Sequence, residues 1–135
     1  AAKESTLRIV DYKTGGNPKI PANIEQLFTP SETRPNYIFQ TFLYASIMCR
    51  QQTLKVAPAL LYIHRAASDS YSPVIEMGEP RQPKIPVNNF TFFEDEFRKR
   101  LQTLLEEIFS ENEPFTQTED IKKCSYCDFK AICKR

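Results

Sequence analysis

Residues 7–15 read Leu-Arg-Ile-Val-Asp-Tyr-Lys-Thr-Gly, and this stretch decides the fold that we expect for the chain. Residues 7–12 are rich in β-forming side chains, and residues 14–17, Thr-Gly-Gly-Asn, break the run, so we predict one strand followed by a turn. Side chains two positions apart on a strand point to the same face. Asp11 and Lys13 are therefore expected to project together at the C-terminal end of the strand.

A carboxylate beside an ammonium group suits phosphodiester chemistry. The carboxylate can hold Mg²⁺, and the ammonium can orient an attacking water or help to deprotonate it. Asp11 and Lys13 offer this combination just before a flexible Gly-Gly turn. Taken alone, however, an Asp and a Lys two apart on an exposed strand are usually a solvated ion pair. The tripeptide leaves both interpretations open.

Composition narrows the class of protein. The 135 residues are 41% hydrophobic and 12% aromatic, which predicts one domain with a real core and excludes a disordered tail. A net charge of +1 does not indicate a globally basic nucleic-acid binder, although it leaves a local patch open. The sequence holds no apolar run of about 18 residues and no apolar core of a signal peptide, so we expect no membrane span and a cytoplasmic protein.

The first half of the chain predicts a loop, a helix and two strands. Residues 17–35 hold four prolines and should form a loop with one helical turn. Apolar residues at helical spacing predict a helix from Asn36 to about Gln51. Strands are expected at residues 59–63, buried on both faces, and at residues 71–77, where a proline favours an edge or a strand start.

The predicted helix 36–51 carries the second group of candidate residues. Gln40 and Tyr44 are four positions apart, which puts an amide and a phenol on one face, where both could reach a phosphate or a catalytic lysine. They could equally be two ordinary polar residues of an amphipathic helix. Cys49 on the same helix is interpreted as a small core residue, and His64, the sole histidine, as a structural or surface residue.

The second half predicts a long helix and a cysteine-bearing tail. After a proline-rich connector at residues 79–88, the helix runs from Glu94 to about Asn112, with acidic residues in its first turn. Its apolar stripe consists of Phe97, Leu101, Leu104, Leu105, Ile108 and Phe109. We divide the chain into a core over residues 1–113 and a tail over residues 114–135.

The tail contains Cys124-x2-Cys127-x5-Cys133. A Cys-x2-Cys pair is a common bidentate unit for Zn²⁺ or an iron–sulfur cluster, and a third cysteine six residues later fits the same site. Three of the four cysteines lie within the last twelve residues, which favours a metal site over a secreted disulfide framework. The other interpretation is a set of free thiols in a frayed tail.

The three motifs in this order, from Leu7 to Cys133, resemble the RecB-like nuclease domains of the PD-(D/E)xK superfamily. The most similar are the nuclease domain of AddB-type helicase–nuclease subunits and the CRISPR-associated exonucleases with a C-terminal cysteine cluster. The resemblance implies an α/β, restriction-endonuclease-like core with a mixed sheet flanked by helices. It also implies a Mg²⁺- or Mn²⁺-dependent DNA nuclease of recombination and double-strand-break repair, with a helicase or helicase-like partner.

The same resemblance assigns roles to individual residues. Asp11 and the Tyr12 carbonyl would be metal ligands, and Lys13 would position the water that attacks the phosphodiester. Gln40 and Tyr44 would support the site and contact DNA. The tail cysteines, Cys124, Cys127 and Cys133, would be three of the four ligands to a 4Fe-4S cluster that clamps the tail onto the domain.

Two parts of the family pattern are missing from the sequence. The superfamily carries another metal-binding Asp on the preceding strand, but the ten residues before Asp11 contain no Asp, and Glu4 is poorly placed. The fourth cluster cysteine is also missing. We therefore expect an N-terminally truncated fragment that is catalytically inactive, lacks an intact cluster and self-associates through an open sheet edge.

Two further functions remain as alternatives. The domain could be a non-catalytic nucleic-acid-binding or scaffold domain with the same fold, since fold alone does not settle activity. It could also be a small zinc-ribbon-like binding module in which Asp11 and Lys13 are incidental, but such a module makes poor use of the helix that carries Gln40 and Tyr44.

Overall fold

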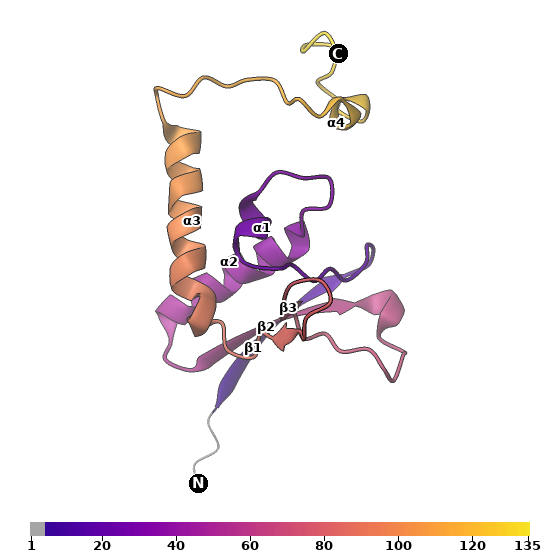
Figure 1. The fold of residues 1–135 in the computed structure, drawn as a ribbon, viewed down its shortest axis with the longest axis vertical. Coiled ribbons are helices and arrows are strands. Elements are labelled where there is room, and N and C mark those ends of the chain that lie inside the picture. The colour runs from indigo at the N-terminus through magenta and orange to yellow at the C-terminus, as the bar shows by residue number, and fades with distance from the viewer. Residues whose placement is uncertain (1–4) are drawn as a thin grey trace. The chain divides into compact units, whose positions relative to one another are not determined.

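The computed structural model describes residues 5–135, which divide into two units, one ending at Leu105 and the other covering Glu106–Arg135. The prediction that they form one domain stays a prediction. Figure 1 shows the elements, which follow one another as β1 (Thr6–Lys13), α1 (Glu25–Phe28), α2 (Asn36–Gln51), β2 (Lys55–Tyr62), the short 3₁₀ helix η1 (Ile63–Arg65), β3 (Glu76–Met77), β4 (Ile85–Pro86), α3 (Thr91–Phe109) and α4 (Ile121–Ser125).

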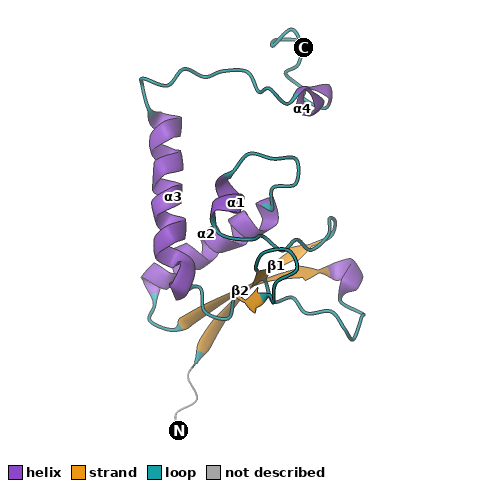
Figure 2. Ribbon diagram, in the orientation of Figure 1, coloured by secondary structure: helices purple, strands orange, loops and turns teal. Residues whose placement is uncertain are grey.

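A parallel pair of strands, β1 and β2, forms the centre of the first unit. Thr6 lies opposite Lys55 and Lys13 lies opposite Tyr62. A parallel pair needs a long crossover between its strands, and α2 provides it and packs against both strands (Figure 2). The predicted strand at residues 7–12 and the predicted helix at residues 36–51 are therefore confirmed.

Strand β2 corrects one predicted boundary. It begins at Lys55, four residues before the predicted start, and includes Pro58. The backbone groups of Val56 and Leu60 bond to Phe90 and Pro73, on the side away from β1. Pro58 has the same parity as these two residues, so its missing N–H also faces away from β1 and removes no bond of the parallel ladder. The proline therefore does not end the strand.

The predicted strand at residues 71–77 is shorter than expected. Only β3 (Glu76–Met77) is regular, and it pairs with β4 in an antiparallel sheet. Residue Val74 touches β2 through one isolated antiparallel bridge to Ala59. Pro73 has no N–H to extend this bridge into a ladder. Within residues 5–135, the expected mixed sheet is thus two two-stranded sheets, and strand β1 has β2 as its sole partner, so self-association through its open edge stays a prediction.

A cluster of aromatic rings joins the helices of the first unit. Phe97 of α3 is fully buried, and its ring lies 5.3–6.0 Å, centroid to centroid, from four other rings. They belong to Phe28, Phe39, Phe42 and Phe90. Phe97 therefore packs α3 onto α1, α2 and the segment that precedes α3.

Helix α3 begins earlier and ends earlier than predicted. The Asn89 carboxamide oxygen accepts hydrogen bonds from the backbone N–H of Thr91 at 3.2 Å and from its hydroxyl at 2.8 Å, which starts the helix at Thr91. The predicted apolar stripe divides in two, because Phe97 is buried while Leu105, Ile108 and Phe109 are exposed. The first half of the predicted stripe is therefore part of the core, whereas its second half is exposed.

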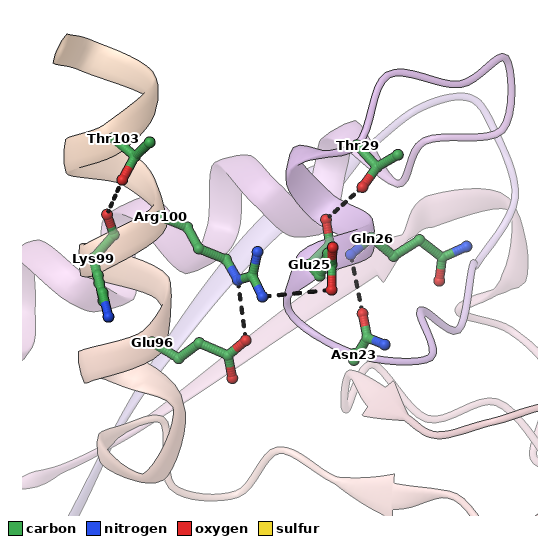
Figure 3. Close-up of polar contacts among 8 residues, drawn as sticks. All are labelled: Asn23, Glu25, Gln26, Thr29, Glu96, Lys99, Arg100 and Thr103. Carbon is green, nitrogen blue, oxygen red and sulfur yellow. Dashed lines mark hydrogen bonds and ion pairs between the residues drawn. The ribbon is translucent and has the colours of Figure 1, made fainter. Parts of the chain in front are cut away.

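Polar contacts at the surface join α3 to α1 (Figure 3). Arg100 donates to Glu96 at 3.0 Å and reaches Glu25 of α1 at 3.5 Å. All three side chains are substantially exposed, and such ion pairs contribute about 0–1 kcal/mol each. The buried rings, and not these charges, hold the helices together.

The second unit contains α4 and the cysteine tail. Asp120 caps α4 by accepting a hydrogen bond from the backbone N–H of Lys122 at 3.2 Å. Gln117 joins the last residues of the chain to the first part of the tail, because it donates to the Cys133 carbonyl at 3.0 Å and accepts from Arg135 at 2.9 Å. No described helix, in either unit, has the length and apolar character needed to cross a membrane.

Phe97 and Phe92 form a matched pair for testing the aromatic cluster. We expect Phe97→Ala to lower the free energy of unfolding by about 3–5 kcal/mol, since it leaves a cavity where four rings meet. Phe92, on the same helix, is 82% exposed, so Phe92→Ala should change stability by no more than about 0.5 kcal/mol. Urea denaturation followed by circular dichroism measures both, and equal transition midpoints would contradict the assigned core.

Candidate active site

The predicted pair at the end of β1 forms an ion pair. The Lys13 ammonium lies 2.8 Å from the Asp11 carboxylate, and their side chains are only 14% and 19% exposed. Strand periodicity brings the two side chains to one face, as expected. A pair this sheltered from water interacts more strongly than the solvated surface pair that was the alternative interpretation. The pair is therefore largely shielded from solvent, while its role in catalysis stays a prediction.

Helix α2 brings the second pair of predicted residues to the first. Lys13 donates to the Gln40 side-chain oxygen at 2.8 Å, and the Gln40 amide nitrogen donates to the Tyr44 hydroxyl at 2.9 Å. Asp11, Lys13, Gln40 and Tyr44 thus form one continuous chain of polar contacts from strand to helix. The structure joins all four predicted residues, while their catalytic roles stay predictions.

Two further residues of α2 belong to this site and were not identified from the sequence. The Lys13 ammonium lies 4.3 Å from the centre of the Tyr37 ring, which is cation–π geometry. The Thr41 hydroxyl donates to the Tyr37 carbonyl at 2.8 Å and lies 3.5 Å from the Asp11 carboxylate. Both positions lie on the stripe of Gln40 and Tyr44, at i, i+3, i+4 and i+7 from Tyr37, so helical spacing was the signal that could have found them.

The turn after β1 packs against the same tyrosine. Gly16 has φ +80°, a conformation that favours glycine, and a Cβ added there would lie 3.0 Å from the Tyr37 ring. A Cβ added at Gly15 would instead meet no atom within 4 Å. Gly16 alone of this Gly-Gly pair is therefore required for the turn to approach Tyr37.

Tyr62, opposite Lys13 on β2, is a buried neighbour of the site. Burial raises the pKa of its hydroxyl, and Tyr71, Tyr37 and Asp11 add to the increase, while Arg65 opposes it. Tyr62 is therefore neutral at physiological pH and offers a hydroxyl and a ring rather than a phenolate.

The residues at the end of β1 supply part of a magnesium site. The Asp11 carboxylate and the Tyr12 carbonyl are the hard oxygen ligands that Mg²⁺ prefers. Within residues 5–135, however, no three His, Cys, Asp or Glu side chains gather in a metal-holding group. Glu4, the one acidic residue before Asp11, lies outside the described residues. The described residues therefore do not make up a complete magnesium site.

The tail cysteines are near one another in sequence but do not form a closed ligand set. Cys124, Cys127 and Cys133 are all free thiols. A turn brings the Cys127 backbone N–H to the Cys124 carbonyl at 3.2 Å, so the Cys-x2-Cys segment has the tight backbone of a bidentate unit. Across the part of the chain that the structure describes, however, the three thiols do not converge into a three-ligand group. The metal-binding role of these cysteines stays a prediction.

The other two candidate ligands have structural surroundings. Cys49 packs against the core, and burial, followed by the charge of Glu94, raises the pKa of its thiol. His64 is exposed and packs edge-on against the Tyr62 ring at 6.0 Å. Both observations agree with the structural roles expected for these residues.

Comparison with models of protein families matches residues 2–134 to the PD-(D/E)XK nuclease superfamily. This chain belongs to that superfamily. The match covers nearly its whole length, and residues 11–13 of β1 lie within it. No curated protein and no solved structure matched the chain. Membership supports a nuclease with a nucleic-acid substrate, since nucleases of this superfamily typically use Mg²⁺ or Mn²⁺ to cleave nucleic acid.

The adjacent Gly15 and Gly16 give a matched test of the turn. We expect Gly16→Ala to lower the free energy of unfolding by more than about 1 kcal/mol, because alanine is strained at this φ and its Cβ meets Tyr37. Gly15→Ala, with open space, should be neutral or stabilising by up to about 1 kcal/mol. Thermal unfolding of both variants is the measurement, and equal effects would show that the turn does not depend on Tyr37.

Proposed function

We propose that this protein is a Mg²⁺- or Mn²⁺-dependent nuclease that hydrolyses phosphodiester bonds of DNA during recombination and double-strand-break repair. The observation that carries this proposal is the Lys13 ammonium, which lies 2.8 Å from both the Asp11 carboxylate and the Gln40 amide oxygen. A lysine fixed in this way is aimed at one point rather than moving freely in solvent. We also propose a helicase or helicase-like partner, by the resemblance to helicase–nuclease subunits.

The proposal divides the work among the residues of the site. Asp11 and the Tyr12 carbonyl are the ligands we propose for the metal ion, which supplies Lewis acidity when bound. Lys13 positions the attacking water. Gln40 holds Lys13 in place and is itself held by Tyr44, so the two helix residues orient the lysine and also face the DNA. Water molecules would be among the remaining ligands of the metal ion, as is usual for Mg²⁺.

Removing the lysine charge tests the proposal. With Mn²⁺ or Mg²⁺ and linear DNA, Lys13→Met should cut the cleavage rate by about 10²–10⁴-fold, because the variant keeps the aliphatic stem and loses only the ammonium. The protein should carry whatever sequence flanks residues 1–135 in its gene. Lys99→Met on α3 is the matched control and should leave the rate unchanged. Equal rates for the two variants would remove Lys13 from the active site.

A non-catalytic DNA-binding or scaffold domain is the second candidate. It is favoured by the incomplete set of metal ligands around Asp11 in the described residues. In such a domain the hydrogen bond from Lys13 to Gln40 would serve only to join β1 to α2. If the wild-type protein, with its flanking sequence, binds DNA without a metal ion and does not cleave it when Mg²⁺ or Mn²⁺ is added, this candidate is favoured over the nuclease.

For the tail, we propose that Cys124, Cys127 and Cys133 bind a 4Fe-4S cluster together with one further ligand. Three thiols with a Cys-x2-Cys turn support this role. After anaerobic reconstitution, Cys127→Ala should lose the bound iron and the visible absorbance of the cluster. Cys49→Ala should keep both, because Cys49 packs against the core of the first unit. If the wild-type protein binds zinc and no iron, the cluster proposal is wrong and the cysteines form a structural zinc site.

A further inference from the structure

A pocket of about 260 Å³ opens beside the candidate active site and has no role in the chemistry described above. Tyr37 and Tyr62 form two of its walls, with ring centroids 6.4 Å apart and planes inclined at 48°. Ile38 adds an apolar surface, and Lys19 and Arg34 line the pocket as cations. The described residues that line it include no acidic side chain.

Tyr37 belongs to both the pocket and the active site. Its ring faces the Lys13 ammonium at 4.3 Å, and the residue is 41% exposed. The turn at Gly16 approaches the same ring and also lines the pocket. A group bound in the pocket would therefore be separated from Lys13, the residue that is proposed to position the attacking water, by the Tyr37 ring alone.

The chemistry of the walls selects a flat, uncharged ring attached to an anion. Aromatic side chains stack on nucleobases whatever their sequence, because every base has a π-face. The cations of the wall are already fixed in position, since Lys19 donates to the Thr33 carbonyl at 2.9 Å and Arg34 donates to the Asn36 side chain at 2.8 Å. Their remaining positive charge favours a phosphate near the pocket.

The size of the pocket favours one base over a base pair. Pockets for drug-sized ligands measure about 300–1,000 Å³, so this pocket suits a smaller group such as a single base. A base can enter it only after leaving the double helix, as in a single-stranded end. A second pocket of about 400 Å³ shares Lys19, Ile38 and Tyr62 with the first and gives the strand room to continue.

We propose that this pocket binds the base of the nucleotide next to the scissile phosphate in single-stranded DNA, and that Tyr37 is its stacking residue. The inference rests on the proposed nuclease function for its substrate. It assigns Tyr37 a role in substrate specificity, separate from the cation–π contact with Lys13. It also assigns the protein a preference for unpaired ends.

The test is a double-mutant cycle that combines a substitution of Tyr37 with an oligonucleotide that lacks one base. Binding of fluorescently labelled single-stranded DNA is measured in EDTA, so that metal-dependent cleavage is stopped. Tyr37→Leu should weaken binding about tenfold, while Tyr37→Phe keeps the ring and should bind normally. An abasic nucleotide is placed at successive positions from the end. At the position that occupies the pocket, the loss of binding free energy caused by the abasic nucleotide and the loss caused by Tyr37→Leu should not be additive.

Additive losses at every abasic position would overturn the proposal, because Tyr37 would then act only through Lys13 or the fold. Blunt duplex DNA bound as tightly as the single strand, with the same loss in Tyr37→Leu, would also overturn it. Phe92→Ala removes an exposed aromatic side chain elsewhere in the first unit and should leave binding unchanged. Because cleavage is not measured, base coupling in a protein that never cleaves DNA would retain the pocket while the nuclease proposal fails.

RNA of the same sequence is the second arm of the experiment. Coupling with DNA supports the pocket and its proposed substrate together. Coupling with RNA alone would overturn DNA as the occupant and, with it, the DNA nuclease of the proposed function.

Discussion

The sheltered position of one ammonium group organises this site. Lys13 has lost most of its contact with water, and a cation in that position is costly unless charged and polar partners replace the water. The partners come from two elements: Asp11 from its own strand, and the Gln40 amide and the Tyr37 ring from helix α2. Because the charge is satisfied only when strand and helix are both in place, the same contacts that fold β1 onto α2 also assemble the site.

Helix α2 can hold Lys13 because one of its faces packs into the core while another presents polar side chains to β1. One face carries Ile38, Phe42 and Ala45 into the core, where Phe42 meets the ring of Phe97. The stripe with Tyr37, Gln40, Thr41 and Tyr44 runs along the side that reaches β1. Burial of the apolar face sets the rotation of the helix, and that rotation fixes which polar side chains meet Lys13. Aromatic packing in the core therefore controls the geometry of the polar site without touching it.

Sequence patterns predicted the features that depend on local periodicity. Strand β1, helix α2, the shared face of Asp11 and Lys13, and the shared face of Gln40 and Tyr44 all follow from periods of 2 and 3.6 residues. The errors arose where a distant partner decides the outcome. Pro58 stays within β2 only because its position faces away from β1, and residues before Glu76 lose their ladder because Pro73 offers no N–H. Helical spacing places Tyr37 and Thr41 on the stripe of Gln40 and Tyr44, but the contacts that bring them into the site, with β1 and with the turn at Gly16, depend on the tertiary fold.

Tyr37 shows how binding and chemistry can share one side chain. A ring that faces a cation on one side has its electron density drawn toward that charge, so a base stacked nearby and the Lys13 ammonium interact with the same π-system. The turn at Gly16 packs close to the same ring, since a Cβ added at this position would lie 3.0 Å from it. A base bound in the pocket and the Lys13 ammonium would therefore contact the same ring. On this proposal, one side chain, Tyr37, both contacts the lysine and stacks on the bound base.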